Sequence, residues 1–208
     1  MNYIFELDKV SFKNIIKYPE LKIEGIKTTF ITGKSGCGKS TLLKLLNCTL
    51  SPSSGEIYYN TTNIKTINTI KLRREVLLVS QSIYLFDESI EKNFENYYNF
   101  IDLDKPSNEM MTKFLRLCCL DYSLNTNCSL MSGGERQRVF LAISLSFMPK
   151  VLMLDEPTSA LDSITSYEVF KNIKTFCIEN NISLICISHD NLLTNKFADN
   201  VINLEKEI

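Results

Sequence analysis

The sequence predicts an α/β fold with a mostly parallel core sheet, antiparallel strands near the N-terminus and an inserted α-helical subdomain. The first observation is that short apolar stretches alternate with stretches of helical spacing from residue 28 onward. The second is that this alternation stops between residues 87 and 130, where the sequence is mainly polar and helical. We therefore expect a single domain over 1–208, with a core at 1–86 and 131–208 and the helical subdomain at 87–130.

The first half of the core contains five strand candidates and one long helix. YIFEL and ELKIEG predict strands near the N-terminus, and TTFIT predicts a third at residues 28–32. The leucines of KSTLLKLLNCTL have helical spacing, so we expect a helix over 39–50 that SPSSG ends. GEIYY predicts the next strand, and IKLRREVLLVSQ predicts a helical turn that leads into a strand ending at Gln81.

The second half continues the alternation of helices and strands. A helix follows residue 131, and VLMLD predicts a strand at 151–155. A helix over 163–180 leads to the strand ISLICIS at 182–188, which is followed by a short helix and the strand candidate NVINLE. Strands joined by helices in this way form a largely parallel sheet, and open α/β sheets bind ligands at the carboxyl ends of their strands.

The composition is that of an ordinary globular protein. Of the 208 residues, 44% are hydrophobic and 23% are charged. The net charge of −1 disfavours a nucleic-acid partner, because proteins that bind nucleic acid usually carry a basic excess. The seven cysteines include no CxxC pair, so we expect reduced, mostly buried thiols. The N-terminus lacks a signal-peptide pattern and no apolar stretch could span a bilayer, which predicts a cytosolic chain.

Residues 33–41, GKSGCGKST, match the phosphate-binding pattern GxxxxGK[ST] between a candidate strand and a candidate helix. The glycines would let backbone N–H groups converge on phosphate oxygens, while Lys39 would reach the β- and γ-phosphates. The alternative, a glycine-rich turn without a ligand, is disfavoured by the register of strand, loop, lysine, serine and helix. The predicted nucleotide contacts in this loop are Gly33, Lys34, Ser35, Gly36, Cys37, Gly38, Lys39, Ser40 and Thr41.

Four further polar residues lie at or just beyond predicted strand ends. VLMLDE places Asp155 at a strand end with Glu156 directly after it, although two acids there could also begin a solvated loop. ICISHD presents His189, the only histidine, and Gln81 ends another strand. A lone histidine is more often a surface or core residue. Beside a phosphate-binding loop, we nevertheless expect Asp155 near Mg²⁺, Glu156 near the attacking water and His189 on the γ-phosphate.

MSGGERQR, at 131–138, is a second candidate anion site. Ser132 is a typical N-cap residue, and Gly133 and Gly134 follow it at the start of a predicted helix. The free N–H groups at a helix N-terminus attract anions. The sequence therefore contains two phosphate-binding candidates.

In order, the chain carries GKSGCGKST, VSQ, MSGGERQR, VLMLDEPTSALD and ISHD. This series resembles the nucleotide-binding subunits of ATP-binding cassette (ABC) transporters over nearly the whole chain. The resemblance implies a P-loop NTPase fold and an ATPase whose cofactors are ATP and Mg²⁺. ITGKSGCGKSTLL and LSFMPKVLMLDEPTSALD carry a narrower likeness to the ATP-binding subunits of iron-export ABC systems.

The resemblance also implies a role for each matching residue. Gln81 would be the Q-loop residue that links Mg²⁺ to the helical subdomain, and Asp155 the acid that supports the metal. Glu156 would be the catalytic base and His189 the switch histidine, with Lys39 and Gln81 completing the catalytic set. The implied metal ligands are Ser40, Gln81 and Asp155.

The resemblance further implies partners. Ser132, Gly133 and Gly134 would form the signature sequence and 159–162 the D-loop, with Asp162 among the nucleotide contacts. In this family the signature of one subunit closes over ATP held by the phosphate loop of another. We therefore expect a second ATP-binding subunit, most simply in a homodimer, and an integral membrane permease. No nucleic-acid partner is expected, and the subunit would lie on the inner face of the cell membrane through its permease.

Two positions depart from the family pattern. The aromatic residue that stacks on adenine would fall on Asn14, which leaves Phe12 and Tyr18 as substitutes. Met131 stands where leucine is common at the start of the signature. The first departure concerns how the adenine of the nucleotide is held, and the second is a mild change from one apolar residue to another.

The segment after Gln81, SIYLFDESIEKNF, places Tyr84, Leu85, Phe86 and Phe94 among charged residues. In the family this region receives a short helix of the membrane subunit. The same residues could instead form the core of the helical subdomain. The sequence does not show which of them are buried in that core and which line a docking surface. A soluble ABC-type ATPase unconnected to a transporter is the alternative function.

Overall fold

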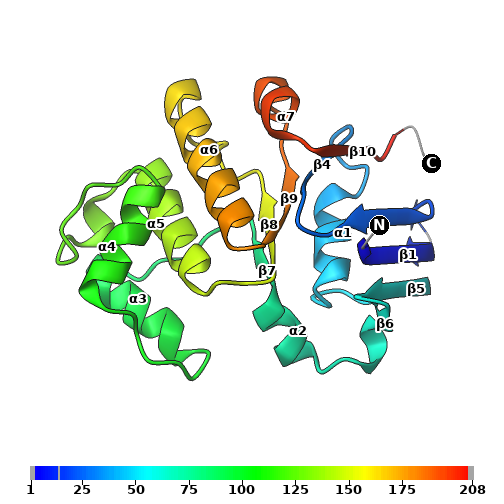
Figure 1. Cartoon of the computed structure of the whole chain (residues 1–208), viewed down its shortest axis with the longest axis horizontal. Coiled ribbons are helices and arrows are strands. Elements are labelled where there is room, and N and C mark those ends of the chain that lie inside the picture. Colours follow the sequence, from blue (N-terminus) through cyan, green and yellow to red (C-terminus); the bar gives the residue numbers. More distant parts are fainter. Residues whose placement is uncertain (1–2, 14, 206–208) are drawn as a thin grey trace.

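The computed structural model describes residues 3–13 and 15–205, which form two sheets with helices around them (Figure 1). In these residues the first sheet is antiparallel, with the order β2-β1-β5-β6 and with β3 also paired to β1. The second sheet is parallel, with the order β10-β4-β9-β8-β7. The antiparallel strands are β1 (Tyr3–Phe12), β2 (Ile16–Lys17), β3 (Leu21–Glu24), β5 (Ser54–Tyr59) and β6 (Thr62–Asn63). The parallel strands are β4 (Thr28–Thr32), β7 (Val76–Val79), β8 (Val151–Asp155), β9 (Ser183–Ile187) and β10 (Asn200–Asn203).

Helices cover both faces of the parallel sheet. They are α1 (Lys39–Leu46), α2 (Thr69–Glu75), α3 (Ile90–Asn99), α4 (Asn108–Leu117), α5 (Gly133–Ser146), α6 (Ser163–Glu179) and α7 (Asn191–Phe197), with 3₁₀ turns at Ile64–Thr66 and Cys128–Leu130. Figure 1 shows α1 between the two sheets. Helices α3, α4 and α5 gather at the end of the molecule away from the antiparallel sheet. No helix of the described part of the chain is long and apolar enough to cross a membrane.

The parallel sheet separates two hydrophobic cores because successive side chains of a strand point to opposite faces. On β8, Leu152 and Leu154 face a core shared with α3–α6. Val151 and Met153 face the other core, which contains the leucines of α1 and the inner faces of β1 and β5. Both faces of the parallel sheet are therefore buried, as expected for parallel strands.

The fold class expected from the sequence is confirmed, and most element boundaries agree closely. The strands at 28–32 and 151–155 match β4 and β8. The strand expected to end at Gln81 ends at Val79, so Gln81 lies in the loop beyond it. The helix expected over 39–50 ends at Leu46, because Asn47 caps it and Cys48 has a φ of +57° that a helix cannot continue.

The predicted helical block at 87–130 contains α3 and α4, but its packing extends beyond it. Phe94 of α3 and Phe114 and Leu115 of α4 share one core with Val139 and Ile143 of α5. The helix that begins at the signature sequence is therefore packed with the helices that precede it. The boundaries at 86 and 131 remain a prediction.

Candidate functional site

Four neighbouring strands end at the same edge of the parallel sheet and bring the predicted catalytic residues together. The phosphate loop follows β4, and His189 follows β9, which is the next strand in the sheet. Glu156 follows β8 and Gln81 follows β7. Since all four strands are parallel, these residues lie in a row in the order loop, His189, Glu156, Gln81. The row lies at the carboxyl ends of the strands, where open α/β sheets bind ligands.

The loop at 33–41 is built from glycines in conformations that favour glycine. Gly33, Gly36 and Gly38 have φ values of +143°, +83° and +102°. A Cβ atom on Gly33 would lie 2.8 Å from the Sγ of Cys37, and one on Gly38 would lie 2.9 Å from the Tyr18 hydroxyl. The loop thus keeps its backbone accessible to a ligand, and α1 begins directly behind it at Lys39.

The Lys39 side chain spans this loop. Its Nζ donates hydrogen bonds to the carbonyl oxygens of Gly33, at 2.7 Å, and Lys34, at 2.9 Å. Lys39 is buried, whereas Lys34, Ser35 and Gly36 at the tip of the loop are exposed. The side-chain positive charge and the N-terminus of α1 both favour an anion at this loop.

The carboxylate of Glu156 contacts two of the other predicted catalytic residues. His189 Nε2 lies 3.2 Å from Glu156 Oε1, and Gln81 Nε2 lies 3.4 Å from Glu156 Oε2. A cavity of about 230 Å³ lies beside Glu156 and His189 and is lined also by Ser159 and Ser188. One polar partner on each carboxylate oxygen fixes the direction of the group toward this edge of the sheet.

The backbone of Glu156 is held in the left-handed region with a φ of +53°, which is unusual for a residue other than glycine. Its N–H donates to the carbonyl of Ile187 at 3.0 Å. Its carbonyl accepts from the N–H and the hydroxyl of Ser159, at 3.3 and 3.1 Å, and from Gln137 Nε2 at 3.4 Å. These contacts hold a backbone conformation that is costly by about 1–3 kcal/mol, and such strain is concentrated at functional sites.

The donor set fits a magnesium ion. Ser40 at the start of α1, Asp155 at the end of β8 and Gln81 supply hydroxyl, carboxylate and carboxamide oxygens, which are the hard donors that Mg²⁺ prefers. Asp155 is buried, with 8% of its surface exposed. Because Gln81 turns its nitrogen to Glu156, its Oε1 remains available as an acceptor.

The predicted signature residues begin α5. Ser132 is its N-cap and forms a capping box with Glu135. The Ser132 N–H donates to Glu135 Oε2 at 2.8 Å, and the Ser132 hydroxyl donates to the same oxygen at 2.7 Å. Ser132 and Gly133 are exposed, so they are open to a partner.

Gly134 packs against the predicted D-loop. A Cβ on Gly134 would lie 2.8 Å from Leu161 Cδ2 and 2.9 Å from the Ala160 carbonyl oxygen. At the end of this segment, Asp162 is the N-cap of α6 and accepts hydrogen bonds from the N–H groups of Ile164 and Thr165, each at 3.0 Å. The pKa of the Asp162 carboxyl is lowered first by a hydrogen bond from the Thr165 side chain and then by the backbone N–H groups of Thr165 and Ile164. Asp162 therefore has a capping role in addition to any contact with nucleotide.

Tyr18 and Gln137 contribute to the site but were missed as such in the sequence. Tyr18 is buried and donates to the Gly38 carbonyl at 2.8 Å, and burial raises the pKa of its hydroxyl. It is thus a support of the phosphate loop and not an exposed ring for adenine. Phe12 is partly buried, with Lys13 Nζ 5.5 Å from its ring centroid, and Asn14 lies outside the described residues. Gln137 lies between two arginines in SGGERQR, and this pattern did not indicate that it belongs to the site.

The segment after Gln81 divides between core and surface. Leu85 and Phe94 are buried, whereas Tyr84 is 64% exposed and Phe86 is partly buried. Tyr84 and Phe86 belong to an aromatic face that also contains Tyr97, Phe100 and Phe140, with ring centroids 5.0–6.3 Å apart.

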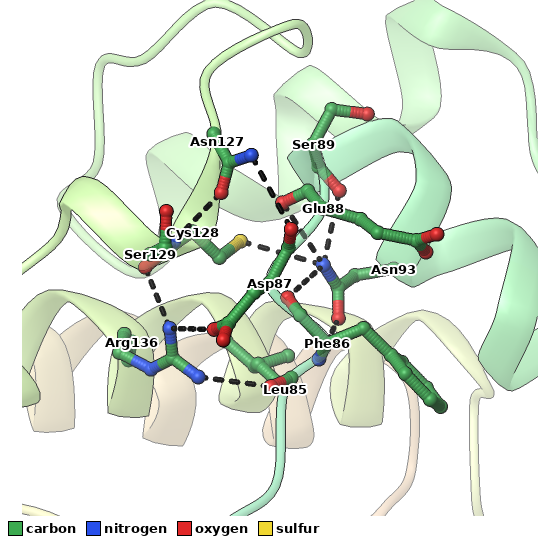
Figure 2. A network of polar contacts seen from close by, with 10 residues as sticks. All are labelled: Leu85, Phe86, Asp87, Glu88, Ser89, Asn93, Asn127, Cys128, Ser129 and Arg136. Atoms are coloured by element: carbon green, nitrogen blue, oxygen red, sulfur yellow. Dashed lines mark hydrogen bonds and ion pairs between the residues drawn. The ribbon is translucent and has the colours of Figure 1, made fainter.

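A polar network around residues 85–89 holds the backbone of the segment (Figure 2). Arg136 of α5 donates to the carbonyls of Leu85, at 2.8 Å, and Cys128, at 2.7 Å, and pairs with Asp87 at 3.3 Å. The buried Asn93 accepts from the Phe86 N–H at 2.8 Å and donates to the Phe86 carbonyl at 3.1 Å. The network joins the loop after Gln81 to the helix that begins at the signature sequence.

The chain is similar to known proteins over most of its length. A family model described as ABC transporter matches residues 16–159. The chain is 38% identical over 176 residues to the probable iron export ATP-binding protein FetA of Escherichia coli strain K12, covering 84% of this chain and 77% of that protein. It is 31% identical over 214 residues to the energy-coupling factor transporter ATP-binding protein EcfA2 of Staphylococcus epidermidis, covering 99% of this chain and 75% of that protein.

Solved structures are similar over nearly the whole chain. A dimeric structure of a post-hydrolysis state of the ATP-binding cassette MJ0796, bound to ADP and phosphate, has a TM-score of 0.82 at 26% identity and covers 96% of this chain and 94% of that one. The structure of cbiO1 from Clostridium perfringens, part of the ABC transporter complex cbiONQ, has a TM-score of 0.84 at 27% identity and covers 98% and 85%. The chain therefore belongs to the ABC transporter family, as one of its ATP-binding and ATP-hydrolysing subunits.

Proposed function

We propose that Glu156 is the catalytic base of this ATPase and that Gln81 and His189 orient it. The observation that carries the proposal is the contact of each Glu156 carboxylate oxygen with one of these two side chains. A carboxylate held in this way accepts a proton from water while the water oxygen forms a bond to the γ-phosphorus. The bond from that phosphorus to the β–γ bridging oxygen breaks, and ADP leaves.

The loop at 33–41 binds the phosphates in this proposal. Lys39 exchanges its contacts with Gly33 and Lys34 for oxygens of the β- and γ-phosphates, because an anion is a better acceptor for an ammonium group than a neutral carbonyl. His189 serves the γ-phosphate from the neighbouring strand end. Mg²⁺, held by Ser40, Gln81 and Asp155, would neutralise charge on the phosphate oxygens.

The site is completed by a second copy of the chain. Ser132, Gly133 and Gly134 cover the γ-phosphate of nucleotide bound to the partner, with Asp162 near the same interface. This is supported by the exposed N-terminus of α5 and by the dimeric state reported for MJ0796. A homodimer is the simplest assembly, because one chain carries both the loop and the signature sequence.

Replacement of the proposed base tests the proposal. Glu156→Gln keeps the size of the side chain but removes the proton acceptor, so we expect ATP hydrolysis to fall by about 100-fold or more. The phosphate clamp remains, so ATP should convert the variant into a stable dimer while ADP should not. Light scattering measures the dimer, and phosphate release measures turnover. Normal turnover would remove Glu156 from the role of base, and a monomer with saturating ATP would refute the shared site.

We further propose that the aromatic face of Tyr84, Phe86, Tyr97, Phe100 and Phe140 docks a membrane permease, which would place the subunit on the inner face of the cell membrane. Support comes from the exposed rings of Tyr84 and Phe100 next to the loop of Gln81. The 38% identity to FetA, compared with 31% to EcfA2, favours iron as the transported substrate.

One purified complex tests both parts of this proposal. Tyr84→Ser should reduce co-purification with the membrane subunit, whereas Ile178→Ser, an exposed apolar position on α6, should not. In the wild-type complex, Fe²⁺ should stimulate ATP hydrolysis more than Co²⁺ or Mn²⁺. Equal recovery of the two variants would refute the docking face, and an absence of metal preference would refute iron transport.

A further inference from the structure

The hydroxyl proton of Ser132 is committed within its own chain. Glu135 carries a pKa lowered to about 2, first by its hydrogen bond with Tyr122 and then by those with Ser132, so its carboxylate is ionised and can only accept. At 2.7 Å from Glu135 Oε2, the Ser132 hydroxyl must therefore be the donor. A phosphate oxygen also needs a donor, and a hydroxyl has one proton. Nucleotide brought by a partner must therefore compete with Glu135 for the Ser132 hydroxyl.

Tyr122 contacts the other oxygen of the same carboxylate. Its hydroxyl donates to Glu135 Oε1 at 2.6 Å, from the loop between α4 and the 3₁₀ turn at Cys128–Leu130. That loop is fastened to α5 by Arg138, which donates to the Cys119 carbonyl at 2.6 Å. Tyr122 thus draws electron density from the carboxylate, which weakens Glu135 as an acceptor for Ser132.

We propose that Tyr122 is a positioning residue for the signature serine: by holding Glu135, it lets the Ser132 hydroxyl pass from Glu135 to the γ-phosphate of nucleotide on the partner subunit. The inference rests on the proposed role of Ser132 in closing the dimer. Without Tyr122, the free Oε1 leaves an unpaired charge beside the arriving phosphate, and the carboxylate holds Ser132 more strongly. Without the charge of Glu135, the competition becomes much weaker, because a neutral carboxamide oxygen is a poorer acceptor for the Ser132 hydroxyl, and Tyr122 has no charge left to hold.

The test uses the full chain in the Glu156→Gln background, where ATP-driven dimers persist. Tyr122→Phe should raise the ATP concentration for half-maximal dimerisation by roughly three- to tenfold, the range expected for one lost hydrogen bond at a partly exposed site. Glu135→Gln should lower that concentration, and the double variant should behave as Glu135→Gln alone. ADP binding to the monomer, measured by calorimetry, should be unchanged, since it requires no partner.

Tyr167→Phe is the matched control, because Tyr167 has 37% exposure against 36% for Tyr122 and lies on α6. It should leave the dimerisation midpoint unchanged. The proposal is overturned if Tyr122→Phe does not shift the midpoint, if the shift persists in the presence of Glu135→Gln, or if ADP binding weakens equally, which would indicate damage to the fold. Failure of the Glu156→Gln background to dimerise at all would instead refute the shared site itself.

Discussion

Two single residues, Glu156 and Gly134, link separate segments of the candidate site. Glu156 has a left-handed backbone whose carbonyl is bound by Ser159 and Gln137. The fixed backbone and the contacts of its carboxylate with His189 and Gln81 together set the direction of that carboxylate. Gly134 has a comparable importance, since its missing side chain allows α5 to approach the segment of Ala160 and Leu161. The predicted signature sequence and the segment after Glu156 are thereby packed together within one chain.

The two glycines of the signature sequence should respond differently to an added methyl group. Gly134→Ala would place its Cβ 2.8 Å from Leu161 Cδ2 and 2.9 Å from the Ala160 carbonyl oxygen, which forces the backbone to move. We expect this overpacking to cost about 1–3 kcal/mol in the free energy of unfolding. Gly133→Ala meets nothing within 4 Å and should be neutral or stabilise the helix by up to about 1 kcal/mol. Urea unfolding of the monomer measures both, and equal effects would contradict the packing described.

At the scale of elements, the sequence predicted where strands begin and end better than which strands lie next to one another. VLMLD is apolar up to Asp155, TTFIT consists of β-branched and aromatic residues, and both are bounded by clear breaks, so their boundaries could be predicted. The strand order that brings His189 between the phosphate loop and Glu156 could not, because pairing depends on packing between distant segments. The partnership of Tyr122 with Glu135 was equally hidden, since the loop around Tyr122 has no periodicity. The two-residue strand β2 is too short to give a pattern.

The network of Figure 2 ties the loop at 85–89 to α5, and Arg136 is its donor from that helix. Arg136→Met would keep the apolar stem but leave the carbonyls of Leu85 and Cys128 without this donor. We expect the free energy of unfolding to fall by about 1.5–3 kcal/mol, the range for hydrogen bonds from a charged group. Hydrogen exchange should also become faster at the Phe86 N–H, which is bonded to Asn93.

Arg116→Met provides the control for this change, because Arg116 is exposed on α4. It should alter neither stability nor the exchange of Phe86. If Arg136→Met lowers stability without faster exchange at Phe86, the arginine supports the helix bundle but does not fix the loop.

At the scale of the whole molecule, the parallel sheet is shared by two cores. Leu152 and Leu154 of β8 belong to the core of the helical end, and Val151 and Met153 of the same strand belong to the core around α1. Neither core can lose its packing without exposing one face of the sheet. The helices α3–α5 and the antiparallel strands should therefore unfold together, although they lie at opposite ends of the molecule (Figure 1).

Matched substitutions in the two cores test this cooperativity. Phe94 on α3 and Ile57 on β5 are both fully buried, one in each core. Replacing either with alanine should cost about 2–5 kcal/mol in the free energy of unfolding and lower the midpoint of one common transition. Leu130→Ala, at an 83% exposed position, should change it little. Calorimetry distinguishes the outcomes: equal calorimetric and van't Hoff enthalpies indicate one unit. A separate early transition in Phe94→Ala alone would instead show that the helical end unfolds independently, because the shared strand would then fail to couple the two cores.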